Sequence, residues 1–145
     1  MSRVPPKMRR LARQLMASEK RAHRSYATTS LAALPESDRL RPHLSNLMGD
    51  AGSRALLSRA LVLAQEEVPR LSGLRVNGDG SWAGLEALQL QLGPQAILKG
   101  KEEILAQLLG LLVAFIGPNL TWGLLGDVWP QLWLTARKFE TGDEI

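Results

Sequence analysis

The chain has 145 residues, a length that fits one domain with a sizeable hydrophobic core. It contains no cysteine, which excludes disulfides, thiolate metal sites and a cysteine nucleophile. The net charge of +4 is unevenly spread, because residues 1–24 contain eight basic residues and one acidic residue, whereas residues 25–145 contain ten basic and thirteen acidic residues. A near-neutral body with a cationic leader indicates a polyanionic partner, which could be nucleic acid, an anionic membrane surface or an acidic protein patch.

The leader has the pattern of a two-faced helix. Pro5 and Pro6 suit its start, because proline lacks a backbone donor that would be unpaired there anyway. Apolar residues then recur at spacings of three and four and form one stripe. They are Met8, Leu11, Ala12, Leu15 and Met16. The basic residues lie on or beside the opposite face and are the candidate polyanion-binding residues: Arg9, Arg10, Arg13, Lys20, Arg21 and Arg24.

Four interpretations of this basic helix stay open. The simplest is a helix that docks through its apolar stripe and leaves its arginines solvated. The others are binding to nucleic-acid phosphates, binding to an acidic protein surface, and binding to anionic lipid. In a protein-binding role, the apolar stripe itself is a candidate interface, through Met8, Leu11 and Leu15.

Residues 25–38 are expected to be a linker, in which Pro35 breaks any helix and Ser37 or Asp38 caps the next one. A short helix is predicted over 40–48, with Gly49 at its end. The clearest helix in the sequence follows over 53–68, because its leucines and alanines form a wide apolar face.

A small β-hairpin is predicted near residues 74–82. Asn77-Gly78 and Asp79-Gly80 supply the positive φ angles that a tight two-stranded turn requires. A helix or turn is expected over 85–92, and a further helical stretch runs from Gln95 into 104–116, which is apolar on nearly every side.

The sequence from 104 to 126 carries no charged residue over 23 positions, which is long enough to span a bilayer. Gly117-Pro118-Asn119 interrupts it, so two short helices in a buried hairpin are expected in preference to a membrane span. The sequence does not decide whether this segment is part of the core or forms a subunit interface.

The last predicted helix follows this break. Its apolar positions are Leu120, Leu124, Leu125, Val128 and Trp129, and Pro130 ends it. Buried tryptophans belong most often to a core and are also enriched at binding hot spots. We therefore also regard the C-terminal tryptophans as candidate interface residues: Trp122, Trp129 and Trp133.

No residue pattern indicates catalysis, a cofactor or a metal ion. The sequence from Asn77 to Ser81 begins like a calcium loop, but Trp82 replaces the required glycine and Leu88 replaces the bidentate glutamate, so a turn is expected. The adjacent pairs Glu66-Glu67 and Glu102-Glu103 are expected to be solvated surface residues, because neighbours in a helix point in different directions.

Three stretches resemble parts of short bacterial proteins of unassigned function: LRPHL at 40–44, RALLSRAL at 54–61 and QLLGLLVAFIG at 107–117. With the Val4-Pro5-Pro6 start included, the resemblance covers most of the chain. It implies a bacterial, cytoplasmic protein and carries over no activity and no site residues.

Together these features predict a mainly all-α protein, with a compact bundle of four to five helices and one small hairpin. The expected organisation is a basic helical arm (1–24), a linker (25–38), a helical domain (39–137) and a polar tail (138–145). The expected function is that of a non-enzymatic adaptor or accessory subunit that binds another protein or its own copies. The alternatives are a nucleic-acid-binding accessory protein and a protein that binds an anionic membrane surface.

Overall fold

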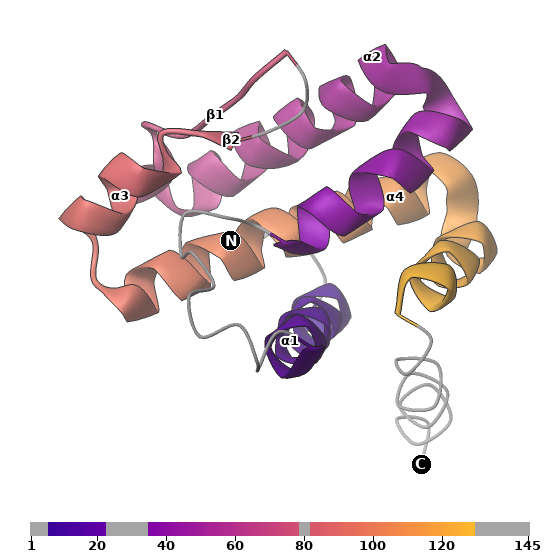
Figure 1. The fold of residues 1–145 in the computed structure, drawn as a ribbon, viewed down its shortest axis with the longest axis horizontal. Coiled ribbons are helices and arrows are strands. Elements are labelled where there is room, and N and C mark those ends of the chain that lie inside the picture. The colour runs from indigo at the N-terminus through magenta and orange to yellow at the C-terminus, as the bar shows by residue number, and fades with distance from the viewer. Residues whose placement is uncertain (1–5, 23–34, 79–81, 130–145) are drawn as a thin grey trace.

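The computed structural model describes residues 6–22, 35–78 and 82–129. This part of the chain is mainly helical, with one small antiparallel sheet, as the sequence predicts. In chain order, its elements are α1 (Pro6–Ala22), α2 (Pro35–Glu67), the 3₁₀ turn η1 (Pro69–Leu71), β1 (Arg75–Val76), β2 (Trp82–Ala83), α3 (Leu85–Gln91) and α4 (Pro94–Val128). The long helices α2 and α4 lie side by side, α1 packs against α4, and the hairpin and α3 lie at one end (Figure 1).

Helix α2 begins at Pro35, so the last four residues of the segment expected to be a linker are helical. The prediction that Pro35 breaks a helix is wrong, since proline is tolerated in the first turn, where its missing donor would be unpaired. The bend in α2 lies at Gly49, whose φ of 79° and ψ of 163° are outside the helical region. Helical structure resumes directly at Asp50 and continues to Glu67.

The predicted hairpin is confirmed in a minimal form. Arg75 pairs with Ala83, and Val76 pairs with Trp82. Residues 79–81 of its turn lie outside the described residues. Gly84 then precedes α3 with a φ of 91°, and a Cβ at this position would lie 2.5 Å from the Gly73 carbonyl oxygen. Only glycine fits this close approach without strain.

Helix α4 contains a second bend of the same kind. Gly117 has a φ of 86° and a ψ of 162°, and the helix continues from Pro118 to Val128. The Thr121 hydroxyl donates a hydrogen bond to the Gly117 carbonyl, with 2.8 Å between the two oxygens. The predicted break at Gly117-Pro118-Asn119 is therefore a bend between two helical arms. Both bends, at Gly49 and at Gly117, lie at the end of the molecule opposite α3 (Figure 1).

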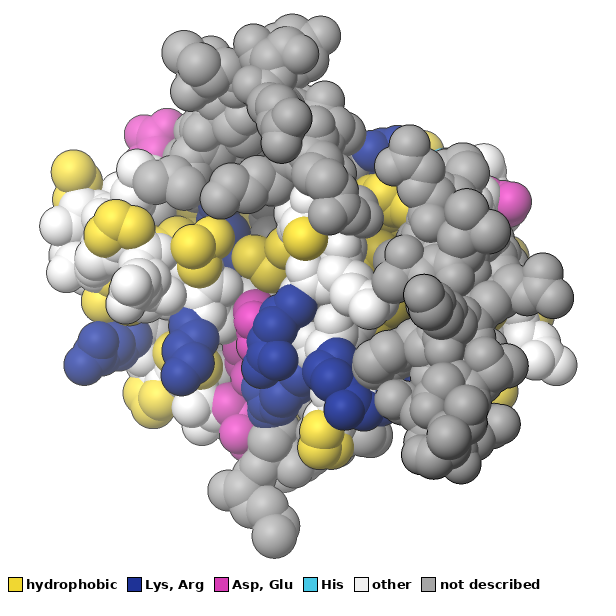
Figure 2. All heavy atoms as spheres, turned by 90° about the horizontal axis from the view of Figure 1, so that it is seen from below, with side chains coloured by type: hydrophobic (Ala, Val, Ile, Leu, Met, Phe, Trp, Pro, Cys, Tyr) yellow, Lys and Arg dark blue, Asp and Glu magenta, His cyan; other side chains and the backbone are white. Residues whose placement is uncertain are grey.

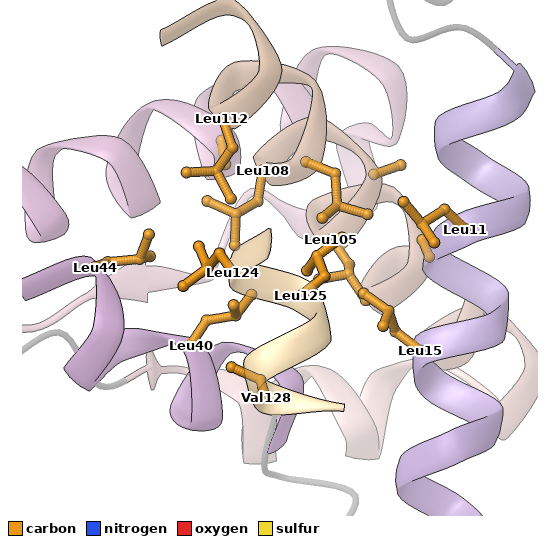
Figure 3. Close-up of a cluster of buried hydrophobic side chains, with 14 of the residues drawn as sticks. Leu11, Leu15, Leu40, Leu44, Leu105, Leu108, Leu112, Leu124, Leu125 and Val128 are labelled. Atoms are coloured by element: carbon orange, nitrogen blue, oxygen red, sulfur yellow. The ribbon is translucent and has the colours of Figure 1, made fainter. Parts of the chain in front are cut away.

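The main core lies where α1, α2 and both arms of α4 meet. Leucines from α1 point toward α4, and leucines from the start of α2 meet the second arm of α4 (Figure 3). Leu15, Leu40, Leu44, Leu105 and Leu109 are among its fully buried side chains. A second cluster lies beneath the hairpin and α3, where residues of α2, η1 and α4 contact Leu85 and Leu88.

Candidate functional site

The basic face of α1 meets acidic side chains of the helical body. The Arg9 guanidinium donates hydrogen bonds from both Nη atoms to the two carboxylate oxygens of Glu103 on α4. The Glu103 side chain is only 5% exposed, and the Arg9 side chain is 23% exposed. Gln107 donates from Nε2 to Glu103 Oε2 at 2.8 Å, and Glu67 Oε1 of α2 lies 4.0 Å from Arg9 Nη2. The expectation that Glu103 is a solvated surface residue is wrong.

A second, more exposed ion pair lies one turn along α1. Arg13 donates from Nε to Glu102 Oε1 at 2.9 Å, with the Arg13 side chain 59% exposed. Arg10 is exposed and also takes part in an interaction within the chain. Lys20 and Arg21 lie in α1, although their side chains are outside the described part, and Arg24 lies outside it altogether.

These two ion pairs limit the ability of α1 to bind a polyanion. On the face shown in Figure 2, Lys and Arg side chains form a row, and acidic side chains lie between two of them. Bidentate Arg–carboxylate bonds are short-range, directional and stronger than neutral hydrogen bonds. The bonds to Glu103 use two of the five N–H donors of Arg9 and compensate its charge, which weakens any contact between Arg9 and a phosphate group. The structure thus holds Arg9 and Arg13, two of the six predicted polyanion ligands, in bonds to α4.

The apolar stripe of α1 is directed inward. Leu11 and Leu15 are 3% and 0% exposed, and Met8 packs beside them against the same cluster. Among the predicted interface tryptophans, Trp129 is 4% exposed and Trp122 is partly buried against the core, while Trp133 lies outside the described residues. Leu11, Leu15 and Trp129 thus contribute to the packing of one chain and are not part of an outer surface.

An apolar surface does occur around the second bend of α4. We call it the apolar corner and define it by four exposed residues, Ala114, Phe115, Pro118 and Leu120. Phe115 is 71% exposed and Leu120 is 61% exposed. Leu120 was expected on the buried face of its helix, and this expectation is wrong. The corner lies within the 23-residue segment that carries no charge.

Sequence reasoning did not identify the ion pairs or the apolar corner. The partners of Arg9 and Arg13 lie 94 and 89 residues away in the chain, a distance that no local pattern spans. One signal was present, because Gln107 interrupts an otherwise apolar run and lies one helical turn after Glu103. A buried polar side chain in such a run needs a hydrogen-bond partner, and Glu103 is within reach.

By length and composition, α4 could cross a membrane, and 44% of its most apolar window is buried inside the protein. The core helix of a soluble protein meets the same criteria, so this finding is weak evidence for a membrane span. Within the described residues, no group of three or more His, Asp or Glu side chains is arranged to hold a metal ion.

Comparisons of the chain with protein-family models, with curated proteins and with solved structures found no match. The resemblance to short bacterial proteins stays a prediction.

Proposed function

We propose that this chain is a non-enzymatic adaptor or accessory subunit that binds another protein through its apolar corner. The observation that carries this proposal is the exposure of Phe115 and Leu120 on either side of the Gly117 bend. Large apolar side chains that gather at one place on a surface are typical of contact sites, and aromatic residues are enriched among binding hot spots.

The chemistry of the corner favours an apolar protein surface as its partner. The nearest charged residues in sequence are Glu103 on one side and Asp127 on the other. Because the corner's own side chains carry no charge, the uncharged face of an amphipathic helix could pack on them without desolvating a charge of the corner. The two helical arms that meet at the bend also hold the four side chains on regular structure, which limits the entropy lost on binding.

The nucleic-acid alternative rests on the outward basic residues of α1. It is less well supported, because Arg9 and Arg13 already bind Glu103 and Glu102. Its prediction is binding that weakens steeply with salt. The membrane-surface alternative predicts co-sedimentation of the chain with anionic vesicles and not with neutral ones.

Site-specific photocrosslinking in cells tests the proposal. Benzoylphenylalanine is placed at Phe115 or Leu120, and at Leu90 as the control, because Leu90 is 90% exposed on α3, away from the corner. We expect the same crosslinked protein from positions 115 and 120, identified by mass spectrometry, and none from position 90. A crosslink to lipid, to a second copy of the chain, or with equal yield from position 90 would refute the adaptor function.

A further inference from the structure

A polar recess lies beside the first bend of α2, on a different element from the apolar corner. It has a volume of about 540 Å³. Its polar lining comes mainly from the residues that flank Gly49: Arg41, Ser45, Asn46, Asp50, Ser53 and Arg54. Gly78, in the turn between β1 and β2, also lines the recess.

The start of a helical arm faces this recess. Because Gly49 is non-helical, the arm that runs to Glu67 begins at Asp50, and it has more than four turns. The first N–H groups of a helix and the positive end of its dipole form a favourable environment for an anion. Asp50 and Ser53, both in the first turn of this arm, line the recess.

The Ser53 hydroxyl is buried beside this recess. The residue is 2% exposed, and its Oγ has no hydrogen-bond partner within the described part of the chain. A buried hydroxyl without a partner destabilises a fold, so native proteins almost always provide one. Since Ser53 lines the recess, a ligand oxygen bound there would supply the missing hydrogen bond.

Two guanidinium groups add positive charge to the same space. Arg54 donates from Nη1 to the Gly78 carbonyl at 2.7 Å, which fixes the group and uses one of its five N–H donors. Arg41 is held by an interaction within the chain and is partly exposed. Guanidinium groups bind phosphate oxygens in bidentate geometry.

The Asp50 carboxylate restricts which phosphate-containing ligands this recess would bind. A carboxylate repels a phosphate but accepts a hydrogen bond from a hydroxyl group. We propose that this recess binds a small phosphate monoester that carries a hydroxyl group, with its phosphate between Arg41, Arg54 and the Ser53 hydroxyl, and its hydroxyl on Asp50. Ser45 and Asn46 supply further neutral hydrogen-bonding groups at the rim.

Titration of the ¹⁵N-labelled full chain, followed by amide chemical shifts, tests the site. The probes are inorganic phosphate and glycerol 3-phosphate, each compared with sodium chloride at matched ionic strength. We expect saturable shifts in residues 50–54 with both phosphates, and tighter binding of glycerol 3-phosphate. Shifts that chloride reproduces, or that spread over all basic residues without saturation, would overturn the proposal.

Two arginine variants distinguish phosphate binding at this specific site from binding through the net positive charge of the protein. Arg54→Gln should weaken phosphate binding at least fivefold. Arg59→Gln is the matched control, because Arg59 is an exposed arginine of the same helix that does not line the recess. It should change the affinity less than twofold. An equal loss in both variants would mean that phosphate binds only through net charge, which would overturn the proposal.

Ser53→Ala tests the buried hydroxyl with two measurements, the Tm without ligand and the affinity for phosphate. Without ligand, its Tm should equal or exceed that of the wild type, because an unpartnered buried hydroxyl is removed. Its affinity for phosphate should fall at least threefold. A lower Tm together with unchanged affinity would identify the hydroxyl as structural and overturn the proposal.

Asp50→Ala tests the ligand class. It should bind inorganic phosphate more tightly, because a like charge is removed, and should lose the preference for glycerol 3-phosphate. If the wild type shows no such preference and Asp50→Ala changes neither affinity, the assignment of a hydroxylated monoester is wrong. These outcomes are independent of the crosslinking result at the apolar corner.

Discussion

Replacement of Glu103 by glutamine removes the charge that Arg9 binds while it keeps the shape of the side chain. Loss of one partner from a fully buried ion pair costs about 3–5 kcal/mol, because the other charge is left without compensation. Here the cost is smaller, since the Arg9 side chain is 23% exposed and the Glu67 carboxylate lies 4.0 Å away. We expect Glu103→Gln to lower the free energy of unfolding by about 2 kcal/mol.

Urea unfolding, followed by circular dichroism, measures this loss. The midpoint should fall at an unchanged slope, and a thermal scan should show a Tm lower by about 6–8 °C for a domain of this size. The matched control is Glu102→Gln. Its partner Arg13 is 59% exposed, so this pair should contribute only about 0.2–1 kcal/mol.

A double-mutant cycle with Arg9→Met and Glu103→Gln isolates the interaction between the two side chains. We expect a coupling energy of about 1.5 kcal/mol, because bidentate charge-assisted bonds exceed ordinary ones. If Glu103→Gln costs no more than Glu102→Gln, or if the cycle shows no coupling, the ion pair does not hold α1 on the body.

Three further substitutions test the packing and the corner. Leu15→Ala, at a side chain with no exposure, should cost about 3 kcal/mol in urea unfolding, whereas Ala17→Ser on the exposed side of α1 should change stability by less than about 0.5 kcal/mol. Gly84→Ala should cost more than about 2 kcal/mol, because it combines a φ of 91° with a Cβ clash on Gly73, and a wild-type Tm would show that the turn is not strained. Phe115→Ser should leave the Tm within about 2 °C of the wild type, as expected for an exposed side chain, and a large drop would mean that Phe115 belongs to the core.

The helices could be predicted from local pattern because their apolar spacing and their glycine and proline residues are local signals. The continuity of the helices through their glycines could not be predicted in this way. Gly49 and Gly117 were expected to end helices, and both are non-helical as expected, but the chain turns and resumes a helix at once. A glycine at positive φ is compatible with a helix end and with a sharp bend. Only the packing of the second arm onto the core, as with Leu124 and Leu125, decides between them.

The site residues were harder to predict than the fold, because their roles depend on contacts between distant parts of the chain. Charge counting found the basic helix but not its acidic counterpart, since Glu103 looked like one half of an ordinary surface pair. The same limit applies to the recess beside Gly49. Nothing in the local sequence indicates that Ser53 is buried without a partner, or that Arg54 lies beside the hairpin backbone at Gly78.

The ion pairs also constrain any role for α1 in binding a polyanion. Its apolar stripe is anchored by Leu11 and Leu15, and its inner arginine is bonded to a buried carboxylate. A polyanion that recruited Arg9 would leave the Glu103 charge in the protein interior without its cation, which costs more than a phosphate contact near the surface returns. Binding of α1 to nucleic acid while it stays docked must therefore rely on its outward basic residues, and full use of the helix requires that α1 leaves the core. The same contacts that make α1 part of the body make the apolar corner, and not the basic helix, the better candidate for a partner surface.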